Sequence, residues 1–528
     1  MRFFNTAGPV NCQDHYCLPP LSRFDLPEIL SLITQKKYFV LHAPRQSGKT
    51  SCLLALRDHL NCEGNYTALY INVESGQTAR GDVRKGIKAI LGELGFQAER
   101  TLGDTTLREL INTGFEEFGE NVAFKIILSN WCSRYKKPLV LCIDEVDALV
   151  GDTLISLLRQ IRSGYPERPS SFPVSIILCG VRDVRDYRIH SEKDQEIITG
   201  GSAFNIKAES LRLGNFSQEE TRTLCLQHTA ETGQLFEEEA LSAIWNLTCG
   251  QPWLVNALAY EICFRLEEGR DQKNPITEYL VMEAKERLIQ RRDTHLDQLV
   301  DKLKEERFRG VIEPMLTGEA FEQDFRPDDV GYLVDLGLIT QDRNGALSIA
   351  NPIYQEIIPR ELSWSAQTGM ALNSSWYIDT SGRLNLYDLL KAFVQFFREH
   401  SESWLDIAQY KEAGPQLLLQ AFLQRIVNGG GQITREYGLG MGRTDLFILW
   451  HLPNGNFQRF VIECKVMRGS REATISSGFT QVLKYADSCG ADEVYLVIFD
   501  KTKKKSWDKK IFTETREQDG VTVTVFGM

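Results

Sequence analysis

The stretch APRQSGKT, at residues 43–50, decides the fold of the first part of the chain. It follows an apolar run, KKYFVLH at residues 36–42, that is typical of a short buried strand. After it, residues 48–60 predict an amphipathic helix with Leu53, Leu54 and Leu56 turned inward. A loop of the form G-x-x-x-x-G-K-[ST] between a strand and a helix surrounds nucleotide phosphates with backbone N–H groups. We therefore predict a nucleotide-binding loop made of Ala43, Pro44, Arg45, Gln46, Ser47, Gly48, Lys49 and Thr50.

Two residues of this loop have distinct chemical roles. Lys49 is expected to reach the β- and γ-phosphates, and the hydroxyl of Thr50 is expected to hold Mg²⁺. Ala43 stands where a glycine is usual, and its single methyl keeps that side chain small. The expected ligands are ATP and one Mg²⁺.

A second apolar strand ends in acids. Residues 138–149 read PLVLCIDEVDAL. Asp144, at the carboxyl end of this strand, would reach the Mg²⁺ through water, and Glu145 would orient and deprotonate the attacking water. Two adjacent carboxylates favour hydrolysis over passive nucleotide sensing, and a buried strand that merely ends in acids is the alternative.

A third strand, expected at residues 174–179, leads into Arg182 and Arg185. Either arginine could stabilise charge on the γ-phosphate in the transition state, within the chain or from a neighbouring subunit. Surface ion pairs would explain both residues equally well. The hint of a shared site leads us to expect a homo-oligomer of undetermined size.

Residues 211–265 have helical periodicity, with a start signal SQEE at residues 217–220 and GQPW at residues 250–253. Together with the phosphate loop, this pattern resembles the STAND and archaeal-type branch of AAA-like P-loop ATPases. In that branch a helical lid carries a Gly-x-Pro element near the nucleotide, so the resemblance implies that Pro252 lies there. IDEVDAL also resembles origin-recognition initiator ATPases, but these usually carry a lid arginine where this chain has Gly-Gln-Pro.

The next module has helix signals followed by a short hairpin. Within residues 296–362, YLVDLGLI precedes a turn with Asn344-Gly345 at its tip, and ALSIANPIY follows. This order resembles a winged helix, which reads DNA in many proteins and acts as a rigid spacer in others. Residues 325–336 lack a basic cluster, which favours a spacer or relay. The polar residues 363–384 are expected to form a linker.

A second candidate site lies near the end of the chain, where a helix predicted at residues 416–427 is followed by a β-hairpin. Asp445 begins the first strand of this hairpin. Glu463 and Lys465 lie two residues apart on the second strand, so they share one face of it, and Cys464 points to the other.

Register sets a condition on this site. Pairing centred on the Asn454-Gly455 bond would place Asp445 opposite Cys464, on the wrong face. An odd-length connection centred near Asn454, or a bulge, is required to place Asp445 opposite Glu463.

Two carboxylates at this spacing can bind Mg²⁺, and Lys465 would stabilise charge or orient the nucleophile. The constellation resembles the PD-(D/E)XK nuclease superfamily, with Thr444 where the nominal proline would be. Gln481 and Tyr485 match the QxxxY element of its RecB-like branch. The resemblance implies that Asp445, Glu463, Lys465, Gln481 and Tyr485 form the catalytic site, with Asp445 and Glu463 holding one or two Mg²⁺, for which Mn²⁺ can substitute. The acid often supplied by the first helix has only weak candidates: Glu412 lies before that helix, and Gln416 or Gln420 could stand in its place.

The composition is that of a folded protein. The chain has 528 residues, 42% hydrophobic and 25% charged, and no apolar run approaches the roughly 18 residues that span a bilayer. A net charge of −11 argues against a protein that coats nucleic acid generally. The N-terminus lacks the apolar core of a secretory signal, and the 12 cysteines show no metal-binding spacing. We therefore expect a cytoplasmic protein with no membrane contact, no structural zinc and no disulfides.

Together these motifs predict an α/β multidomain chain. We expect an ASCE/AAA-like P-loop ATPase core at residues 1–205, a helical lid at 206–292, a winged-helix-like module at 293–362, a linker at 363–384 and a PD-(D/E)XK nuclease-like domain at 385–528. This order resembles prokaryotic ATPase and nuclease fusion proteins associated with mobile elements and antiviral defence. The first hypothesis is an ATP-regulated, Mg²⁺-dependent endonuclease, with DNA favoured over RNA as the partner. The alternative is a DNA-binding or signalling ATPase whose C-terminal domain binds but does not cut.

Overall fold

The chain forms two compact units in the computed structural model. The first unit comprises residues 1–297 and 326–352, and the second comprises residues 298–325 and 353–528. The structure describes all residues except 183–187, 191–196, 200–204, 292–304, 306, 309–310, 313–314, 316–325, 343–344, 363–376, 406–418, 421, 424–430, 440–441, 454, 468, 501, 503–504 and 519. Only the backbone is described at residues 188–190, 197–199, 290, 358–362, 399–405, 431–432, 434–439, 442–445 and 488.

The first unit contains a parallel five-stranded sheet in the order β4-β5-β6-β3-β9. The strands are β3 (Tyr38–His42), β4 (Thr67–Asn72), β5 (Leu139–Asp144), β6 (Ser175–Gly180) and β9 (Lys207–Arg212). β3, β5 and β6 are buried almost throughout, which explains their nearly continuous apolar sequences and confirms the three strands predicted there. Because the strands are parallel, the segments that follow these three strands meet at one edge of the sheet.

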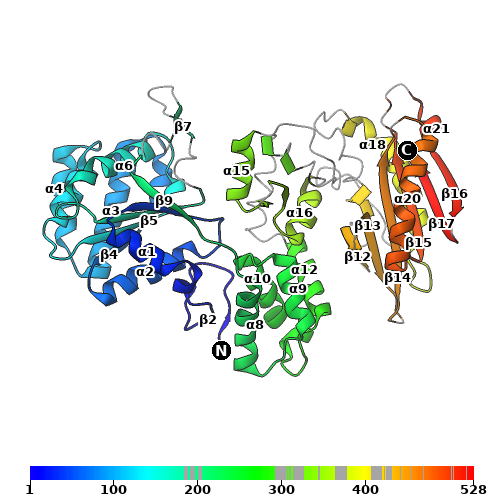
Figure 1. The fold of residues 1–528 in the computed structure, drawn as a ribbon, viewed down its shortest axis with the longest axis horizontal. Helices are drawn as coiled ribbons and strands as arrows, with labels where there is room; N and C mark the ends of the chain where they lie inside the picture. Colours follow the sequence, from blue (N-terminus) through cyan, green and yellow to red (C-terminus); the bar gives the residue numbers. More distant parts are fainter. Residues whose placement is uncertain are drawn as a thin grey trace. The chain divides into compact units, whose positions relative to one another are not determined.

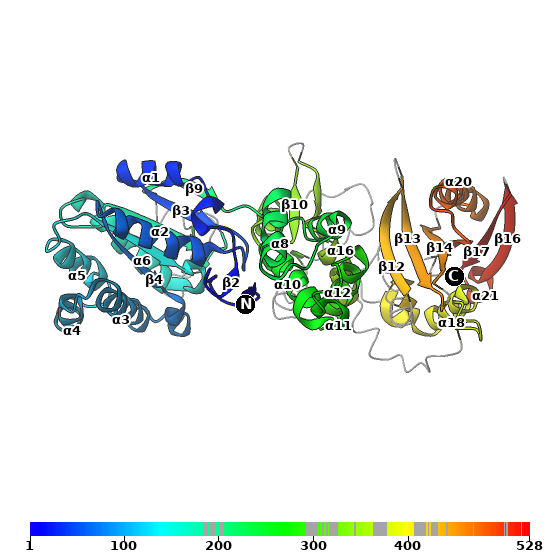
Figure 2. The same ribbon diagram turned by 90° about the horizontal axis from the view of Figure 1, so that it is seen from below.

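Helices cover both faces of this sheet (Figure 2). α1 (Leu26–Thr34) and α2 (Lys49–Glu63) pack on one face, and α3 (Val83–Leu102), α5 (Ala123–Cys132) and α6 (Gly151–Gly164) pack on the other, with α4 (Thr106–Phe118) beside α3 and α5. α2 is the helix predicted after the phosphate loop. It buries Leu53 and Leu56 as expected, whereas Leu54 is only partly buried.

A helical region follows the sheet within the same unit (Figure 1). It contains α8 (Gln218–Thr232), α9 (Glu238–Thr248), α10 (Pro252–Tyr260) and α12 (Glu278–Arg291). α8 begins with a capping box, in which Ser217 Oγ accepts the N–H of Glu220 at 3.1 Å and Glu220 Oε2 accepts the N–H of Ser217 at 2.7 Å. This confirms the predicted helix start. The short N-terminal strands β1 (Phe3–Phe4) and β2 (His15–Tyr16) lie against α10 and α8.

The hairpin of the winged-helix-like module also belongs to the first unit. α15 (Pro327–Asp335) precedes β10 (Ile339–Gln341) and β11 (Leu347–Ile349), which pair antiparallel. The predicted hairpin is therefore present, and turn residues 343–344 lie outside the described residues. α16 (Pro352–Leu362), at the end of the predicted module, falls almost entirely in the second unit.

The second unit is built on a mixed six-stranded sheet in the order β12-β13-β14-β15-β17-β16. The strands are β12 (Gly431–Leu439), β13 (Gly442–His451), β14 (Phe457–Val466), β15 (Glu493–Phe499), β16 (Phe512–Gln518) and β17 (Val521–Gly527). α20 (Arg471–Cys489) packs on one face and α18 (Leu386–Leu405) on the other (Figure 2). α20 connects the parallel strands β14 and β15, so the predicted order of hairpin, helix and strand is confirmed.

Part of the segment expected to be a linker is folded. Residues 363–376 lie outside the described residues, but Tyr377 and Leu384 are buried in the core of the second unit. Asn385 also donates its N–H to the Tyr377 carbonyl at 2.8 Å. Residues 377–384 are therefore part of the second unit.

The prediction that the chain has no disulfides is wrong. Cys12 and Cys17 are bonded, with their Cα atoms 5.6 Å apart. A turn brings them together, because the Asn11 carbonyl accepts the N–H groups of Asp14 and His15. Such a turn is not visible in the spacing of the cysteines. The other described cysteines are free thiols.

Candidate functional site

In the loop between β3 and α2, the lysine side chain is hydrogen-bonded to backbone carbonyls of the same loop. Lys49 Nζ donates to the carbonyl oxygens of Ala43 at 2.9 Å and Pro44 at 3.0 Å, and its side chain is buried. Gly48 has a φ of 94°, which glycine adopts without strain, and it directly precedes the first turn of α2. The N–H groups at a helix start have no partners within the helix and attract anions. This set of donors fits the phosphates of a nucleotide.

Asp144 lies at the end of β5 and contacts the first turn of α2. Its side chain is fully buried, and its Oδ2 accepts hydrogen bonds from Thr50 Oγ1 at 2.6 Å and from Tyr70 OH at 3.0 Å. The two residues predicted to hold Mg²⁺ are therefore in contact, and their oxygens are of the kind that Mg²⁺ prefers. Burial, and then the charge of Asp144, raises the pKa of Tyr70. The sequence gives no sign of this tyrosine, since it lies in an apolar strand like any core residue.

Glu145 directly follows Asp144 and has a φ of 57°. Burial raises the pKa of Glu145, the carboxylates of Asp147 and Asp144 raise it further, and Lys49 lowers it. Once ionised, a carboxylate with a raised pKa is a better base toward water. The position and the environment of Glu145 therefore suit a general base.

Arg182, just after β6, contacts α15 of the winged-helix-like module. Its Nε donates to Asp335 Oδ2 at 3.0 Å, and its guanidinium lies 4.8 Å from the ring centre of Tyr332. The Arg182 and Asp335 side chains keep only 17% and 14% of their surface exposed. In this structure the arginine predicted to sense the γ-phosphate is held by an ion pair, and Arg185 lies outside the described residues.

Two further contacts connect this module to the ATPase core. Arg212, at the end of β9, donates to the Val334 carbonyl at 3.0 Å. Gly337 packs so closely on the phosphate loop that a Cβ there would lie 2.7 Å from Pro44 Cγ. The module therefore touches the phosphate loop directly.

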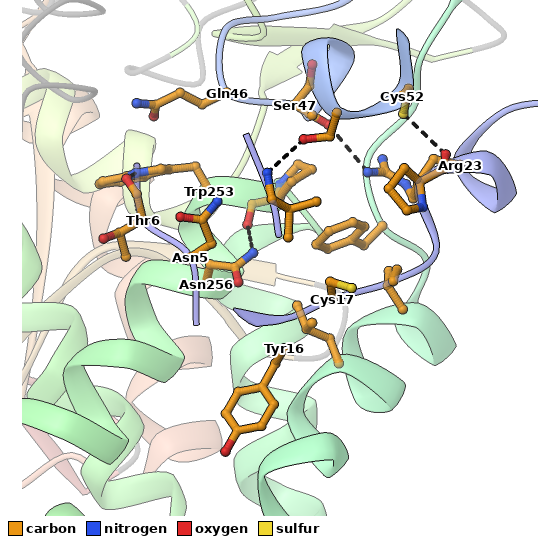
Figure 3. A pocket seen from close by; sticks show the side chains of 18 of the residues that line it. Asn5, Thr6, Tyr16, Cys17, Arg23, Gln46, Ser47, Cys52, Trp253 and Asn256 are labelled. Atoms are coloured by element: carbon orange, nitrogen blue, oxygen red, sulfur yellow. Dashed lines mark hydrogen bonds between the residues drawn. The ribbon is translucent and has the colours of Figure 1, made fainter. Parts of the chain in front are cut away.

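A pocket with an empty volume of about 710 Å³ adjoins the phosphate loop (Figure 3). Gln46 and Ser47 of the loop, the N-terminal segment and the start of α10 line it. Trp253 Nε1 donates to the Thr6 carbonyl at 2.9 Å, which joins α10 to the N-terminal segment. Pro252 also lines the pocket, and its place near the nucleotide stays a prediction.

Arg23 lies at another side of this pocket. It donates to the carbonyls of Ser47 at 3.4 Å and Gly214 at 2.6 Å, and its guanidinium lies 4.4 Å from the ring centre of Phe216. Burial lowers the pKa of Arg23. Partly apolar walls with a few polar groups, next to a phosphate loop, fit a nucleobase and ribose. The sequence does not reveal this pocket, because residues 1–24 carry no motif and are held by contacts with distant helices.

The second candidate site lies between β14 and α20. Lys465 Nζ donates to Glu463 Oε1 at 2.8 Å and to Gln481 Oε1 at 2.7 Å, and Gln481 Nε2 donates to Tyr485 OH at 3.3 Å. Cys464 packs in the core on the opposite face of the sheet, as predicted. Glu463 has no exposed side-chain surface, whereas Lys465 keeps 26%. The structure thus brings together four of the five residues predicted here.

The hairpin has the register that this site requires. His451 pairs with Phe457 and Leu446 pairs with Ile462, so the pairing is centred on residue 454 and the connection is odd in length, as predicted. One step further along this register places Asp445 opposite Glu463 on the neighbouring strand. The side chain of Asp445 lies outside the described residues.

The other metal-ligand predictions are only partly covered by the structure. Glu412 and Gln416 lie outside the described residues, and Gln420 is buried. Among the described residues, no group of three or more His, Cys, Asp or Glu side chains could hold a metal ion. The Asp445 side chain is not among the described side chains, so the metal-binding pair predicted with Glu463 stays a prediction. No helix in the described part of the chain is long and apolar enough to cross a membrane.

Comparison with known proteins gives a family for the part of the chain that contains the phosphate loop. Residues 33–187 match the family model of the AAA domain, so the chain contains an AAA-type P-loop ATPase domain, which implies ATP and Mg²⁺ as its ligands. No curated protein matches the chain.

Several solved structures are similar to part of this chain. A Walker-type ATPase of Pyrococcus abyssi is 14% identical, with 67% of this chain and 99% of that chain covered and a TM-score of 0.47. The RuvB Holliday junction branch migration motor of Thermotoga maritima is 12% identical, with 62% and 92% covered and a TM-score of 0.32. Cdc6p of Pyrobaculum aerophilum is 16% identical, with 65% and 93% covered and a TM-score of 0.34.

Proposed function

We propose that the chain is an ATP-regulated, Mg²⁺-dependent endonuclease, in which the AAA-type ATPase domain controls a PD-(D/E)XK nuclease-like domain at residues 385–528. One observation carries this proposal: Lys465 donates at once to Glu463 on its own strand and to Gln481 on α20. Burying charged and polar groups between a sheet and a helix costs stability, and aliphatic residues would pack there without that cost. Such a cluster therefore suggests a function beyond packing.

At the ATPase site, Lys49 would exchange its contacts with two loop carbonyls for the β- and γ-phosphate oxygens of ATP. Thr50 and Asp144 would hold Mg²⁺, which neutralises phosphate charge when bound. Glu145 would orient the attacking water and accept its proton. The nucleobase would occupy the adjacent pocket.

At the second site, Glu463 and Asp445 would hold one or two Mg²⁺, or Mn²⁺ in their place. When bound, the ion lowers the pKa of a coordinated water and neutralises charge on the phosphodiester. Lys465 would orient the nucleophile or stabilise charge on the phosphate. Gln481, fixed by Tyr485, would keep the Lys465 ammonium in place.

The contacts of α15 support a regulatory link between nucleotide and nuclease. Asp335 holds Arg182, and Gly337 packs on Pro44 of the phosphate loop. If the Arg182 guanidinium moves toward the γ-phosphate, its Nε contact with Asp335 would weaken, so ATP would loosen the hold on α15. Coupling of about 1–3 kcal/mol between two sites is typical of such regulation.

The second candidate is a DNA-binding or signalling ATPase whose C-terminal domain binds but does not cut. The complete burial of Glu463 favours it, because a metal ion would have to displace the contact with Lys465. In either case DNA is favoured over RNA as the partner. The net charge of −11 confines phosphate binding to local surfaces.

A cutting assay tests the proposal. Plasmid DNA, single-stranded DNA and RNA are incubated with Mg²⁺ or Mn²⁺, with and without ATP, using wild type, Lys49→Ala, Asp445→Ala and Lys465→Ala. Asp487→Ala, an exposed carboxylate on α20, is the matched control. We expect wild type and the control to cut and Asp445→Ala and Lys465→Ala not to cut, with ATP hydrolysis retained in both of these nuclease-site variants. Equal nicking by wild type and Asp445→Ala would refute nuclease activity at this site.

The Lys49→Ala variant then gives the sign of regulation. Cutting that no longer depends on ATP would mean that the nucleotide acts as a brake. Loss of cutting would mean that it acts as a trigger.

A further inference from the structure

We propose that Cys12 and Cys17 form a thiol–disulfide exchange site that controls the nucleotide pocket, with a dithiol as the reducing partner. This inference rests on the proposed binding of ATP in that pocket. Cys17 lines the pocket (Figure 3). Cys12, its partner in the disulfide, is exposed to solvent. A reductant can therefore reach one sulfur while the other lies at the ligand site.

The disulfide lies between two anchors that belong to different parts of the first unit. On one side, the N–H of Val10 donates to Ser51 Oγ at 2.9 Å, on the helix that follows the phosphate loop and next to Thr50. On the other side, Gln227 of α8 accepts the Cys17 N–H at 3.1 Å and donates to the Cys17 carbonyl at 2.9 Å. The segment thus joins the ATPase core to the helical lid, and the disulfide shortens it.

The chemistry balances with a dithiol as co-reactant. A thiolate of the dithiol attacks Cys12 Sγ, the Cys12–Cys17 bond breaks, and Cys17 leaves as a thiolate that takes up a proton. The second thiol of the reductant then attacks the mixed disulfide and releases Cys12. The chain gains two thiols, and the reductant becomes a disulfide; the reverse reaction restores the bond.

Another cysteine at the pocket does not compete for this exchange. Cys52 lines the same pocket, but it is buried, and its Sγ donates to the Pro20 carbonyl at 3.3 Å. Burial raises the pKa of Cys52 to about 11, which leaves almost no reactive thiolate at neutral pH. The exposed pair member Cys12 is therefore the point of attack.

Reduction should loosen this segment without unfolding it. The turn at Asn11 keeps its hydrogen bonds to Asp14 and His15 when the disulfide opens. The Cys12–Cys17 bond closes a short loop, and removing it could shift the equilibrium between the folded and the locally opened N-terminal segment by at most about 40-fold. Since the turn persists, we expect reduction to weaken ATP binding by roughly fivefold, a small part of that limit.

The test uses the full chain, oxidised with oxidised glutathione or reduced with dithiothreitol, and peptide mapping by mass spectrometry to establish the bond. The affinity for a non-hydrolysable ATP analogue is measured by calorimetry in both states. Cys12→Ser should show the weaker, reduced-state affinity with or without dithiothreitol. Cys62→Ser, which removes an exposed free thiol elsewhere, should respond to dithiothreitol as wild type does.

Equal affinities in the two states of wild type, with the bond mapped in the oxidised one, would overturn the inference. So would failure of the bond to form on oxidation. A lack of nucleotide binding in both states would instead refute the proposed nucleotide site itself.

Discussion

The ion pair between Lys465 and Glu463 predicts an asymmetry between two substitutions. Glu463 has no exposed side-chain surface and lies 2.8 Å from Lys465 Nζ, whereas Lys465 keeps 26% of its surface exposed. Lys465→Met removes the ammonium and leaves a buried carboxylate beside a methyl group. Glu463→Gln removes the buried charge and leaves an ammonium that can reach water and keep its bond to Gln481. We therefore expect Lys465→Met to destabilise β14 much more than Glu463→Gln, although both should abolish cutting.

The size of the difference follows from burial. Removing one partner of a fully buried ion pair costs about 3–5 kcal/mol, and the partial exposure of Lys465 lowers this to about 2 kcal/mol for Lys465→Met. For Glu463→Gln the loss resembles that of an exposed pair, about 0.5 kcal/mol. At about 1.36 kcal/mol per factor of ten, these values correspond to roughly 30-fold and twofold changes in the local opening equilibrium.

Hydrogen–deuterium exchange of the peptide that covers residues 457–466 measures this equilibrium in the full chain, with EDTA present to exclude metal ions. Lys484→Met, at an exposed lysine on α20, is the matched control and should exchange like wild type. Equal acceleration in both site variants, or faster exchange in Glu463→Gln, would show that the carboxylate does not depend on Lys465. The assignment of these residues as a coupled site would then fail.

Four further predictions concern the first unit. Tyr70→Phe removes a 3.0 Å hydrogen bond to Asp144 and should raise the Mg²⁺ concentration needed for half-maximal ATP hydrolysis by about tenfold; an unchanged metal titration would contradict this. Burial raises the pKa of Glu145, so this base becomes protonated earlier as the pH is lowered. The rate of ATP hydrolysis should therefore begin to decrease at a higher pH than it would with an ordinary glutamate, as a pH–rate profile would show. The same shift contributes to the free energy of unfolding: the contribution is fully present below the ordinary glutamate pKa and is lost as the pH rises through the raised pKa of the folded state. In Glu145→Gln, unfolding curves should no longer show this loss of stability with rising pH. Gly250→Ala would place a Cβ 1.9 Å from the Phe216 carbonyl oxygen at a φ of 69°, and should lower the free energy of unfolding by about 2–4 kcal/mol in denaturant titrations.

The ATPase part of the fold is predictable because several local rules agree there. An apolar strand, a phosphate loop that ends in Gly48-Lys49-Thr50, and a leucine-bearing helix follow each other at residues 36–60, and each supports the others. The capping box at Ser217 is likewise a local signal, since both partners lie within one turn. Such features need no knowledge of the rest of the chain.

The hairpin register shows how far a sequence argument can go without local signals. The proposed nuclease chemistry requires Asp445 opposite Glu463, and this condition predicts either a connection centred near residue 454 or a bulge. The strand pairing is centred on residue 454. The turn sequence itself allows either an even or an odd connection. The predicted position of the site residues therefore specifies the hairpin register more closely than the turn sequence does.

Features that depend on distant contacts are not predictable in this way. The role of Tyr70 depends on β5, which lies beside its strand in space, and the nucleotide pocket depends on residues 1–24 reaching α8 and α10. The Cys12–Cys17 bond depends on a turn whose hydrogen bonds are not evident from residue type. In each case the tertiary structure determines which residues come into contact.

Arg182 shows why such partners also matter for regulation. Its place after β6 predicts a γ-phosphate contact, yet in this structure it pairs with Asp335, 153 residues further along the chain. The Nε–H of Arg182 that donates to Asp335 cannot donate to a phosphate at the same time, so a γ-phosphate contact through this group would displace Asp335. Nucleotide binding and docking of α15 must then be linked if Arg182 turns to the phosphate, and a ligand can shift this balance only by the difference in its affinity for the two states. The sequence allowed either a γ-phosphate contact or a surface ion pair for Arg182, and only the structure identifies Asp335 as the ion-pair partner.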